Sequence, residues 1–200
     1  KLELDWGKGL LATGDCVRAE GRLERDALLS DTFFADKLEK LEGSEREELL
    51  AKLEKAADER ANSFARKAPL LIDDANMRRM QAKILEGARR IKAASFFGRA
   101  ILVRFNNDAD GATAGLAIVS MIKPEKANAL MHPSAVYVEK DATRDIMVLG
   151  REFRPLLVLV DFGANQESVV GLNLVKAAGF SVFVIDHHPP SKEAVALLDF

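Results

Sequence analysis

The feature that most constrains the fold is a series of short, almost wholly apolar runs in the second half of the chain. Four of them predict strands, over residues 100–105, 135–139, 156–160 and 180–185. Uninterrupted apolar runs of this length are typical of parallel strands that helices cover on both faces. Helical patterns over residues 112–122 and 167–178 separate the strands. The alternation predicts an α/β fold with a doubly wound, mainly parallel sheet.

The first 72 residues have a different pattern, which predicts a mainly helical N-terminal extension. Residues 10–25 contain alternating polar and apolar positions that favour a short hairpin. After residue 31, Phe34, Leu38 and Leu41 recur at helical spacing and predict a helix.

A second helix of this extension is expected to start at Ser44, where Glu47 completes a capping box. We therefore expect two domains, a helical extension over residues 1–72 and an α/β domain over residues 73–200. Two interpretations of the extension remain open: a solvated helical hairpin that packs on the next domain, or a binding arm for a partner or nucleic acid.

A third helical pattern, from about residue 74 to 94, is the most basic segment of the chain. Asp73 or Asp74 can cap it. Its predicted apolar face consists of Met77, Met80, Ile84, Ala88 and Ile91. The basic face fits an ordinary solvated surface, and it also fits a surface that faces phosphates.

The composition is that of a globular protein, and it also bears on the cellular compartment in which the protein is expected. The 200 residues are 48% hydrophobic and 30% charged, with a formal net charge of −2. A nucleic-acid ligand would need a local basic patch or metal ions, because bulk charge would not attract it. The lone cysteine, Cys16, excludes an intrachain disulfide, and no apolar run reaches the ~18 residues of a membrane helix. We therefore expect a cytoplasmic protein.

Polar residues follow three of the four predicted strands. The segments are Asn106-Asn107-Asp108-Ala109-Asp110-Gly111, Asp161-Phe162-Gly163 and Asp186-His187-His188-Pro189-Pro190. Because ligands bind beyond the carboxyl ends of parallel strands, four aspartates and two histidines are expected to converge in one crevice. Each segment alone also fits an ordinary turn or helix cap, and their joint occurrence favours a site. The third histidine, His132, lies beside Pro133 and is predicted to be a surface residue.

Such a set of side chains suits hard or borderline divalent cations. Carboxylate oxygens combined with imidazole nitrogens favour Mn²⁺, Mg²⁺, Fe²⁺ or Zn²⁺. Several carboxylates crowded together without a cation would repel one another. A pair of ions ~3.5–4 Å apart can activate a water and clamp the oxygens of a phosphoryl transfer.

The motifs resemble those of the DHH phosphoesterase superfamily over roughly residues 74–200. Asp186-His187-His188 is similar to the signature that names it, Asp108-Ala109-Asp110-Gly111 to its first motif and Asp161-Phe162-Gly163 to its second. The form of these motifs and the basic helix before them resemble the RecJ-like branch most. That branch holds single-strand-specific exonucleases and relatives that join the GINS and MCM replication factors.

The resemblance implies a role for each residue. Metal ligands would be Asp108, Asp110, Asp161 and His187, with Mn²⁺ or Mg²⁺ as the cofactor and two ions expected. His188 would contact the scissile phosphate, Asp186 would orient the histidine pair, and Asp110 would also serve catalysis. The family has His or Asp where this chain has Asn106, which would be a weaker, neutral ligand. The family also has a further aspartate and a C-terminal domain, so we expect this chain to be a catalytic domain cut short.

Three functions follow from these expectations. The first is a metal-dependent phosphodiesterase that digests single-stranded DNA or RNA, as an exonuclease. The second is a replisome scaffold that binds GINS or MCM and has weak or lost catalysis, which Asn106 and the acidic extension would favour. The third keeps the chemistry but acts on short oligonucleotides or cyclic dinucleotides.

Overall fold

The structure, a computed structural model, describes residues 11–25, 32–65, 72, 74–122 and 127–200. The chain divides into two compact units between Leu53 and Glu54, inside helix α1 (Gly43–Ala65). The domain boundary that we predicted at residue 72 rests on the change in sequence pattern at that position, and it stays a prediction. None of the helices in the described ranges is both long and apolar enough to span a membrane.

The N-terminal unit contains an antiparallel hairpin where a helix was expected. Strand β1 (Cys16–Glu24) pairs with strand β2 (Thr32–Leu41), from Cys16 opposite Leu41 to Glu24 opposite Thr32. The prediction of a helix after residue 31 is therefore wrong. The helical spacing of three apolar residues was outweighed by nine residues of strand pairing, and Phe34 is exposed rather than part of a buried stripe.

The hairpin expected within residues 10–25 is half right, since β1 lies there but its partner comes from β2. Leu10, the first residue of that segment, lies outside the described residues. Helix α1 begins at Gly43, next to the predicted cap Ser44.

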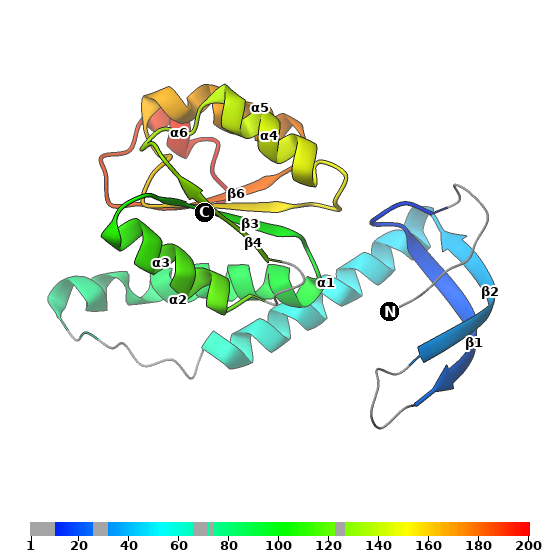
Figure 1. The fold of residues 1–200 in the computed structure, drawn as a ribbon. Coiled ribbons are helices and arrows are strands. Elements are labelled where there is room, and N and C mark those ends of the chain that lie inside the picture. The colour runs from blue at the N-terminus through cyan, green and yellow to red at the C-terminus, as the bar shows by residue number, and fades with distance from the viewer. Residues whose placement is uncertain (1–10, 26–31, 66–71, 73, 123–126) are drawn as a thin grey trace. The chain divides into compact units, whose positions relative to one another are not determined.

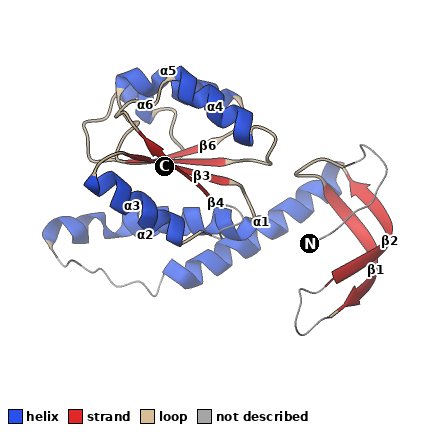
Figure 2. Ribbon diagram, viewed as in Figure 1, coloured by secondary structure: helices blue, strands red, loops and turns tan. Residues whose placement is uncertain are grey.

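The C-terminal unit is built on a four-stranded parallel sheet, which confirms the predicted α/β fold (Figures 1 and 2). The strand order is β4-β3-β5-β6. The strands are β3 (Ile101–Asn106), β4 (Ala127–His132), β5 (Leu156–Val160) and β6 (Ser181–Ile185). Three of them agree with the predicted strands within one residue at each end.

Helices cover both faces of this sheet (Figure 1). One face carries α2 (Ala75–Phe97) and α3 (Ala109–Ser120). The other carries α4 (Glu139–Leu149), the short 3₁₀ helix η2 (Gln166–Ser168), α5 (Val169–Ala177) and α6 (Lys192–Val195). Each face has its own apolar core, since alternate strand residues point to opposite sides.

The predicted cap and apolar face of α2 are partly confirmed. Asp74 accepts hydrogen bonds from the backbone amides of Asn76 and Met77, whereas Asp73 lies outside the described residues. Of the five residues of the predicted face, only Ile91 is buried. Ile91 is 2% exposed, whereas Met80 is 50% exposed.

The second strand was predicted in the wrong place. Residues 135–138 form a loop, and the strand is β4, which begins eight residues earlier than predicted. This loop is apolar because it packs into the core, where Tyr137 is fully buried under α4 and α5. His132, at the end of β4, is 1% exposed, so its predicted surface position is also wrong.

Candidate metal centre

The predicted site residues come together at one edge of the sheet. Strands β3, β5 and β6 are neighbours in the sheet and all parallel, so the segments that follow them emerge side by side. Those segments carry the predicted site residues Asn106, Asp108, Asp110, Asp161, Asp186, His187 and His188. The convergence that the strand ends predicted is therefore confirmed.

Asp108 is held by the start of α3. It caps this helix, and its carboxylate accepts a hydrogen bond from the backbone amide of Gly111 over 3.0 Å. Residue 111 must be glycine, because a Cβ there would lie 2.7 Å from the backbone oxygen of Asn106. One oxygen of Asp108 is thus used by the cap, and the other faces Asn106.

Asn106 acts as a hydrogen-bond donor in this structure. Its amide nitrogen donates to Asp108 over 2.6 Å and to Asp161 over 3.3 Å. Its amide oxygen accepts from the backbone amide of Asn107 over 3.0 Å, which fixes the orientation of the amide group. Asn106 therefore presents N–H groups, and no free oxygen, to the carboxylates that it was expected to join as a ligand.

Asp161 occupies the centre of the cluster and has unusual backbone geometry. Its φ is +67°, in the left-handed region that is uncommon for residues other than glycine. Its backbone amide donates to the backbone oxygen of Ile185 over 2.7 Å, which ties the end of β5 to the end of β6. The residue is 6% exposed, so its carboxylate is the most buried of the predicted ligands.

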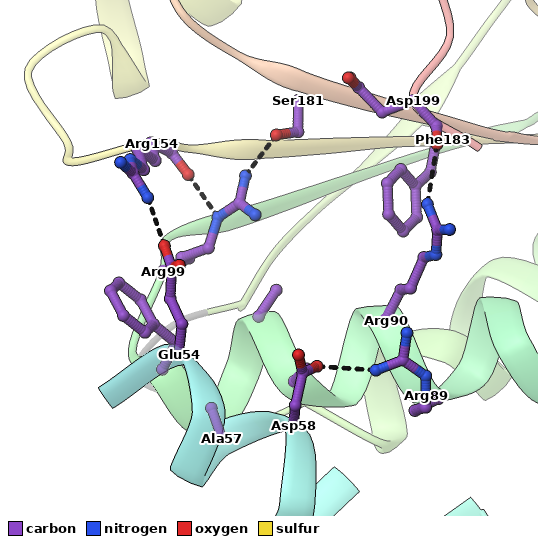
Figure 3. A pocket seen from close by; sticks show the side chains of 13 residues that line it. Glu54, Ala57, Asp58, Arg89, Arg90, Arg99, Arg154, Ser181, Phe183 and Asp199 are labelled. Atoms are coloured by element: carbon purple, nitrogen blue, oxygen red, sulfur yellow. Dashed lines mark hydrogen bonds and ion pairs between the residues drawn. The ribbon is translucent and has the colours of Figure 1, made fainter. Parts of the chain in front are cut away.

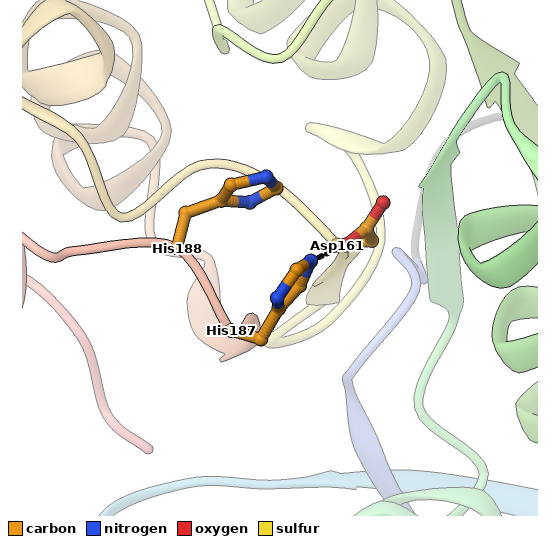
Figure 4. Close-up of side chains that lie close together, drawn as sticks. All are labelled: Asp161, His187 and His188. Carbon is orange, nitrogen blue, oxygen red and sulfur yellow. Dashed lines mark ion pairs between the residues drawn. The ribbon is translucent and has the colours of Figure 1, made fainter.

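His187 faces this buried carboxylate (Figure 4). Its Nε2 lies 3.2 Å from an oxygen of Asp161 and 3.9 Å from an oxygen of Asp110. The side chains of His187 and Asp110 are 70% and 71% exposed. The imidazole thus lies between an internal carboxylate and one at the open edge.

His188 is paired with Asp186. Its Nδ1 lies 2.7 Å from a carboxylate oxygen that also accepts the backbone amide of His188 over 3.0 Å. This hydrogen bond raises the pKa of His188, and the negative charge of Asp186 adds to the effect. Asp186 therefore orients His188, and the described contacts give no bond from it to His187.

Two groups of ligand atoms in the described part of the chain could hold metal ions. One consists of Asp161, His187 and His188, and the other of Asp108, Asp110 and Asp161. Within each group the ligand atoms lie within 4.8 Å of one another. The donor set of carboxylate oxygens and imidazole nitrogens fits Mn²⁺ or Mg²⁺ and lacks the thiolates of a soft-metal site. Asp161 belongs to both groups, as expected of a ligand that bridges two ions.

Sequence reasoning missed a buried polar network behind this edge. Arg104, on β3, is 2% exposed and forms two hydrogen bonds with Asp145, on α4, of 2.7 and 2.6 Å. Burial acts to lower the pKa of Arg104, but its bonds with Asp145 outweigh this effect and raise it. The hydroxyl of Tyr137 donates to the same carboxylate over 2.7 Å. The signal was an arginine inside an otherwise apolar strand, since a buried charge needs a partner.

A pocket of about 340 Å³ lies at the other edge of the same sheet (Figure 3). Its lining includes Arg99 and Arg154, which precede β3 and β5, Ser181, which begins β6, and Phe183 within β6. Its charged groups contact one another: Arg89 is 2.7 Å from Asp58, and Arg154 pairs with Glu54. This pocket contains none of the predicted site residues.

Three comparisons found known proteins that are similar to this chain. Residues 100–200 match the family model described as DHH family, N-terminal domain. The chain is 34% identical over 200 residues to the uncharacterized protein MJ1198 of Methanocaldococcus jannaschii, and the match covers 90% of this chain and 26% of that protein. The chain therefore spans about a quarter of that relative.

A solved structure is similar as well. It is described as the DHH domain of a member of the s1p family of ribosomal proteins, with a TM-score of 0.68 and 28% sequence identity. The similarity covers 79% of this chain and 42% of that one. The family match spans half of the chain and includes every residue of both metal-binding groups. The chain therefore belongs to the DHH family, a superfamily of metal-dependent phosphoesterases.

Proposed function

We propose that this chain is the catalytic part of a metal-dependent phosphodiesterase that hydrolyses single-stranded nucleic acid, as a RecJ-like exonuclease. The observation that carries the proposal is the position of Asp161 in both groups of ligand atoms. A shared carboxylate would hold two ions at the short separation that phosphoryl transfer uses. Mn²⁺ is the ion that we propose, with Mg²⁺ as the alternative.

The roles of the residues follow from their contacts. Asp108, Asp110, Asp161 and His187 would hold the ions, and Asn106 would orient two of these carboxylates through its N–H groups. When bound, the ions supply Lewis acidity and lower the pKa of a coordinated water. Held by the cap of α3 and by the bond from Asp161 to Ile185, the ligands are largely positioned before a metal binds.

We assign His188 to the phosphate rather than to an ion, which leaves Asp161 and His187 as the metal ligands of the group that contains it. Its pKa is raised by Asp186, which favours the imidazolium, a cation that can donate a hydrogen bond to a phosphate oxygen. Its side chain is 46% exposed, so a substrate can reach it. Asp186, with only 5% of its side chain exposed, would hold the ring in place during the reaction.

The open edge of the site favours a polymer over a small enclosed ligand. The side chains of Asp110 and His187 are more than two-thirds exposed, so a strand could lie across them. Because the net charge of the chain is −2, the ions and His188 would have to provide most of the local attraction for phosphate. Short oligonucleotides or cyclic dinucleotides are the alternative substrates.

The test is the hydrolysis of end-labelled single-stranded DNA and RNA in Mn²⁺. We expect degradation by the wild-type chain and a loss of at least about a hundredfold in Asp108→Ala and His187→Ala. Asp58→Ala is the matched control, because Asp58 lies on α1 and lines the separate pocket, away from both groups of ligand atoms. Equal activity in all four proteins would contradict the proposal. Faster cleavage of dinucleotides than of long strands would select the short-substrate alternative.

A second candidate function rests on Asn106. Because its amide nitrogen, a hydrogen-bond donor, faces Asp108, the site has a neutral group where a further ligand is expected. If catalysis is weak or lost for this reason, the protein would act instead as a replisome scaffold that binds GINS or MCM. Co-purification with GINS subunits, together with no Mn²⁺-dependent hydrolysis, would favour this function. A monomer with strong nuclease activity would contradict it.

A further inference from the structure

The ring of His132 stacks flat against the ring of Phe162, the residue that follows Asp161. The ring centroids are 4.4 Å apart, and the planes differ by 6°. Both residues are 1% exposed. Two stacked rings in a closed core leave little room for either to tilt, so the position of Phe162 depends on that of His132.

Two hydrogen bonds fix the orientation of the His132 ring. Its Nδ1 lies 3.3 Å from an amino group of Arg104, which can only donate, so Nδ1 must accept. Its Nε2 lies 2.9 Å from the backbone oxygen of Val136, which can only accept, so Nε2 must carry the proton. These two partners determine one tautomer and one plane for the ring.

Arg104 is itself held by hydrogen bonds. Its guanidinium forms two hydrogen bonds with Asp145, and both side chains are buried. Two parallel bonds of this kind fix the plane of the guanidinium. A rigid path of contacts therefore runs from Asp145 through Arg104 and His132 to Phe162.

The turn at the end of this path needs support. Asp161 has its φ at +67°, a conformation that is strained for a residue other than glycine and persists only when its surroundings enforce it. On one side the turn is held by the bond from the Asp161 amide to Ile185. On the other side, Phe162 is held by the stacked ring.

We propose that His132 is a positioning residue for the metal centre, acting on Asp161 through Phe162. This inference rests on the proposed function, because Asp161 is the ligand shared by both groups. Removing the His132 ring would let the turn relax and would move the Asp161 carboxylate away from its partners. A small displacement of the shared ligand would weaken the binding of both ions.

The test compares His132→Ala with Leu172→Ala, a matched control in the same apolar core that is also fully buried. Mn²⁺ affinity is measured by calorimetry on the 200-residue chain, well below the unfolding temperature of every variant. We expect about a tenfold loss of affinity in His132→Ala and less than about twofold in Leu172→Ala. We also expect His132→Phe, which keeps a flat ring, to restore part of the loss.

A second readout needs no metal. In the metal-free chain, we expect the backbone amide of Asp161 to exchange its hydrogen at least about tenfold faster in His132→Ala, and not in Leu172→Ala. Phe162→Leu, which keeps the site apolar, should behave as His132→Ala does. It replaces His132→Ala in the test if His132→Ala fails to fold. Equal exchange and equal affinity in the His132 and Leu172 variants would overturn the inference. A wild-type chain that binds no Mn²⁺ would instead contradict the proposed function, and amide exchange would still test the positioning.

Discussion

The amide nitrogen of Asn106 lies 2.6 Å from a carboxylate oxygen of Asp108 and donates a hydrogen bond to it. The same nitrogen lies 3.3 Å from Asp161. The partial positive charge on the amide hydrogens of Asn106 therefore reduces the repulsion between these two carboxylates.

Asn106→Asp is expected to strengthen metal binding and to weaken the metal-free fold. A third carboxylate beside Asp108 and Asp161 adds attraction for a cation, which should raise Mn²⁺ affinity about tenfold. Without a cation, the same carboxylates repel one another and the melting temperature should fall. Calorimetric titration and thermal unfolding with and without Mn²⁺ measure both effects.

Asn106→Ala is the control for this substitution, because it removes the donor without adding charge. We expect its Mn²⁺ affinity to stay below that of Asn106→Asp. If the two variants bind Mn²⁺ equally, the side chain at position 106 does not influence the ions, and our interpretation of Asn106 is wrong.

Asp145→Asn should strongly destabilise the C-terminal unit. The change leaves Arg104 buried without its anionic partner, which typically costs about 3–5 kcal/mol of unfolding free energy. Urea unfolding at neutral pH measures the loss. Asp141→Asn is the control, since Asp141 is 3.9 Å from Arg104 and its side chain is partly exposed. We expect it to cost less than about 1 kcal/mol, and a similar cost for both variants would be contrary to this account.

Glu86→Gln should lower stability in a manner that depends on pH. Hydrogen bonds from Arg89 and Arg90 lower the pKa of Glu86 to about 2. A lowered pKa in the folded state stabilises the fold above the ordinary pKa of 4.5, and this contribution is lost as pH falls toward 2. Because the Glu86 side chain is 35% exposed, solvent reduces the effect to about 1 kcal/mol.

Chemical denaturation at pH 7 and at pH 3 checks this prediction. The difference in unfolding free energy between wild type and Glu86→Gln should be larger at pH 7 and smaller at pH 3. Glu59, on α1, lies 4.0 Å from the exposed amino group of Lys55, so Glu59→Gln should show almost no difference at either pH. If the difference in unfolding free energy between wild type and Glu86→Gln grows as the pH falls, the prediction is wrong.

The sheet could be predicted from the sequence because its strands are short apolar runs. Strand β5, for example, is buried at all five positions, as an uninterrupted apolar run indicates. The hairpin could not be predicted in the same way. Residues Phe34 and Leu38 fit helical spacing, and only their pairing with β1 shows that the segment is a strand.

The edge of the sheet that holds the site could also be predicted, because topology alone brings the ends of β3, β5 and β6 together. The roles of Asn106 and His132 could not. The donor role of Asn106 depends on the orientation of its amide group, which the backbone amide of Asn107 determines. The buried position of His132 depends on Arg104 and Val136, and neither contact follows from the neighbouring Pro133.

The most direct test of the central claim is a count of the Mn²⁺ ions bound, by electron paramagnetic resonance of the free ion, in the wild type and in single variants. We expect two ions in the wild-type chain and none at the same Mn²⁺ concentration in Asp161→Asn, which removes the shared ligand. Asp108→Asn and His187→Gln should each retain one ion, because each belongs to one group. Asp58→Asn should bind as the wild type does. If Asp161→Asn binds Mn²⁺ as well as the wild type does, Asp161 is not the shared ligand and the account of the site is wrong.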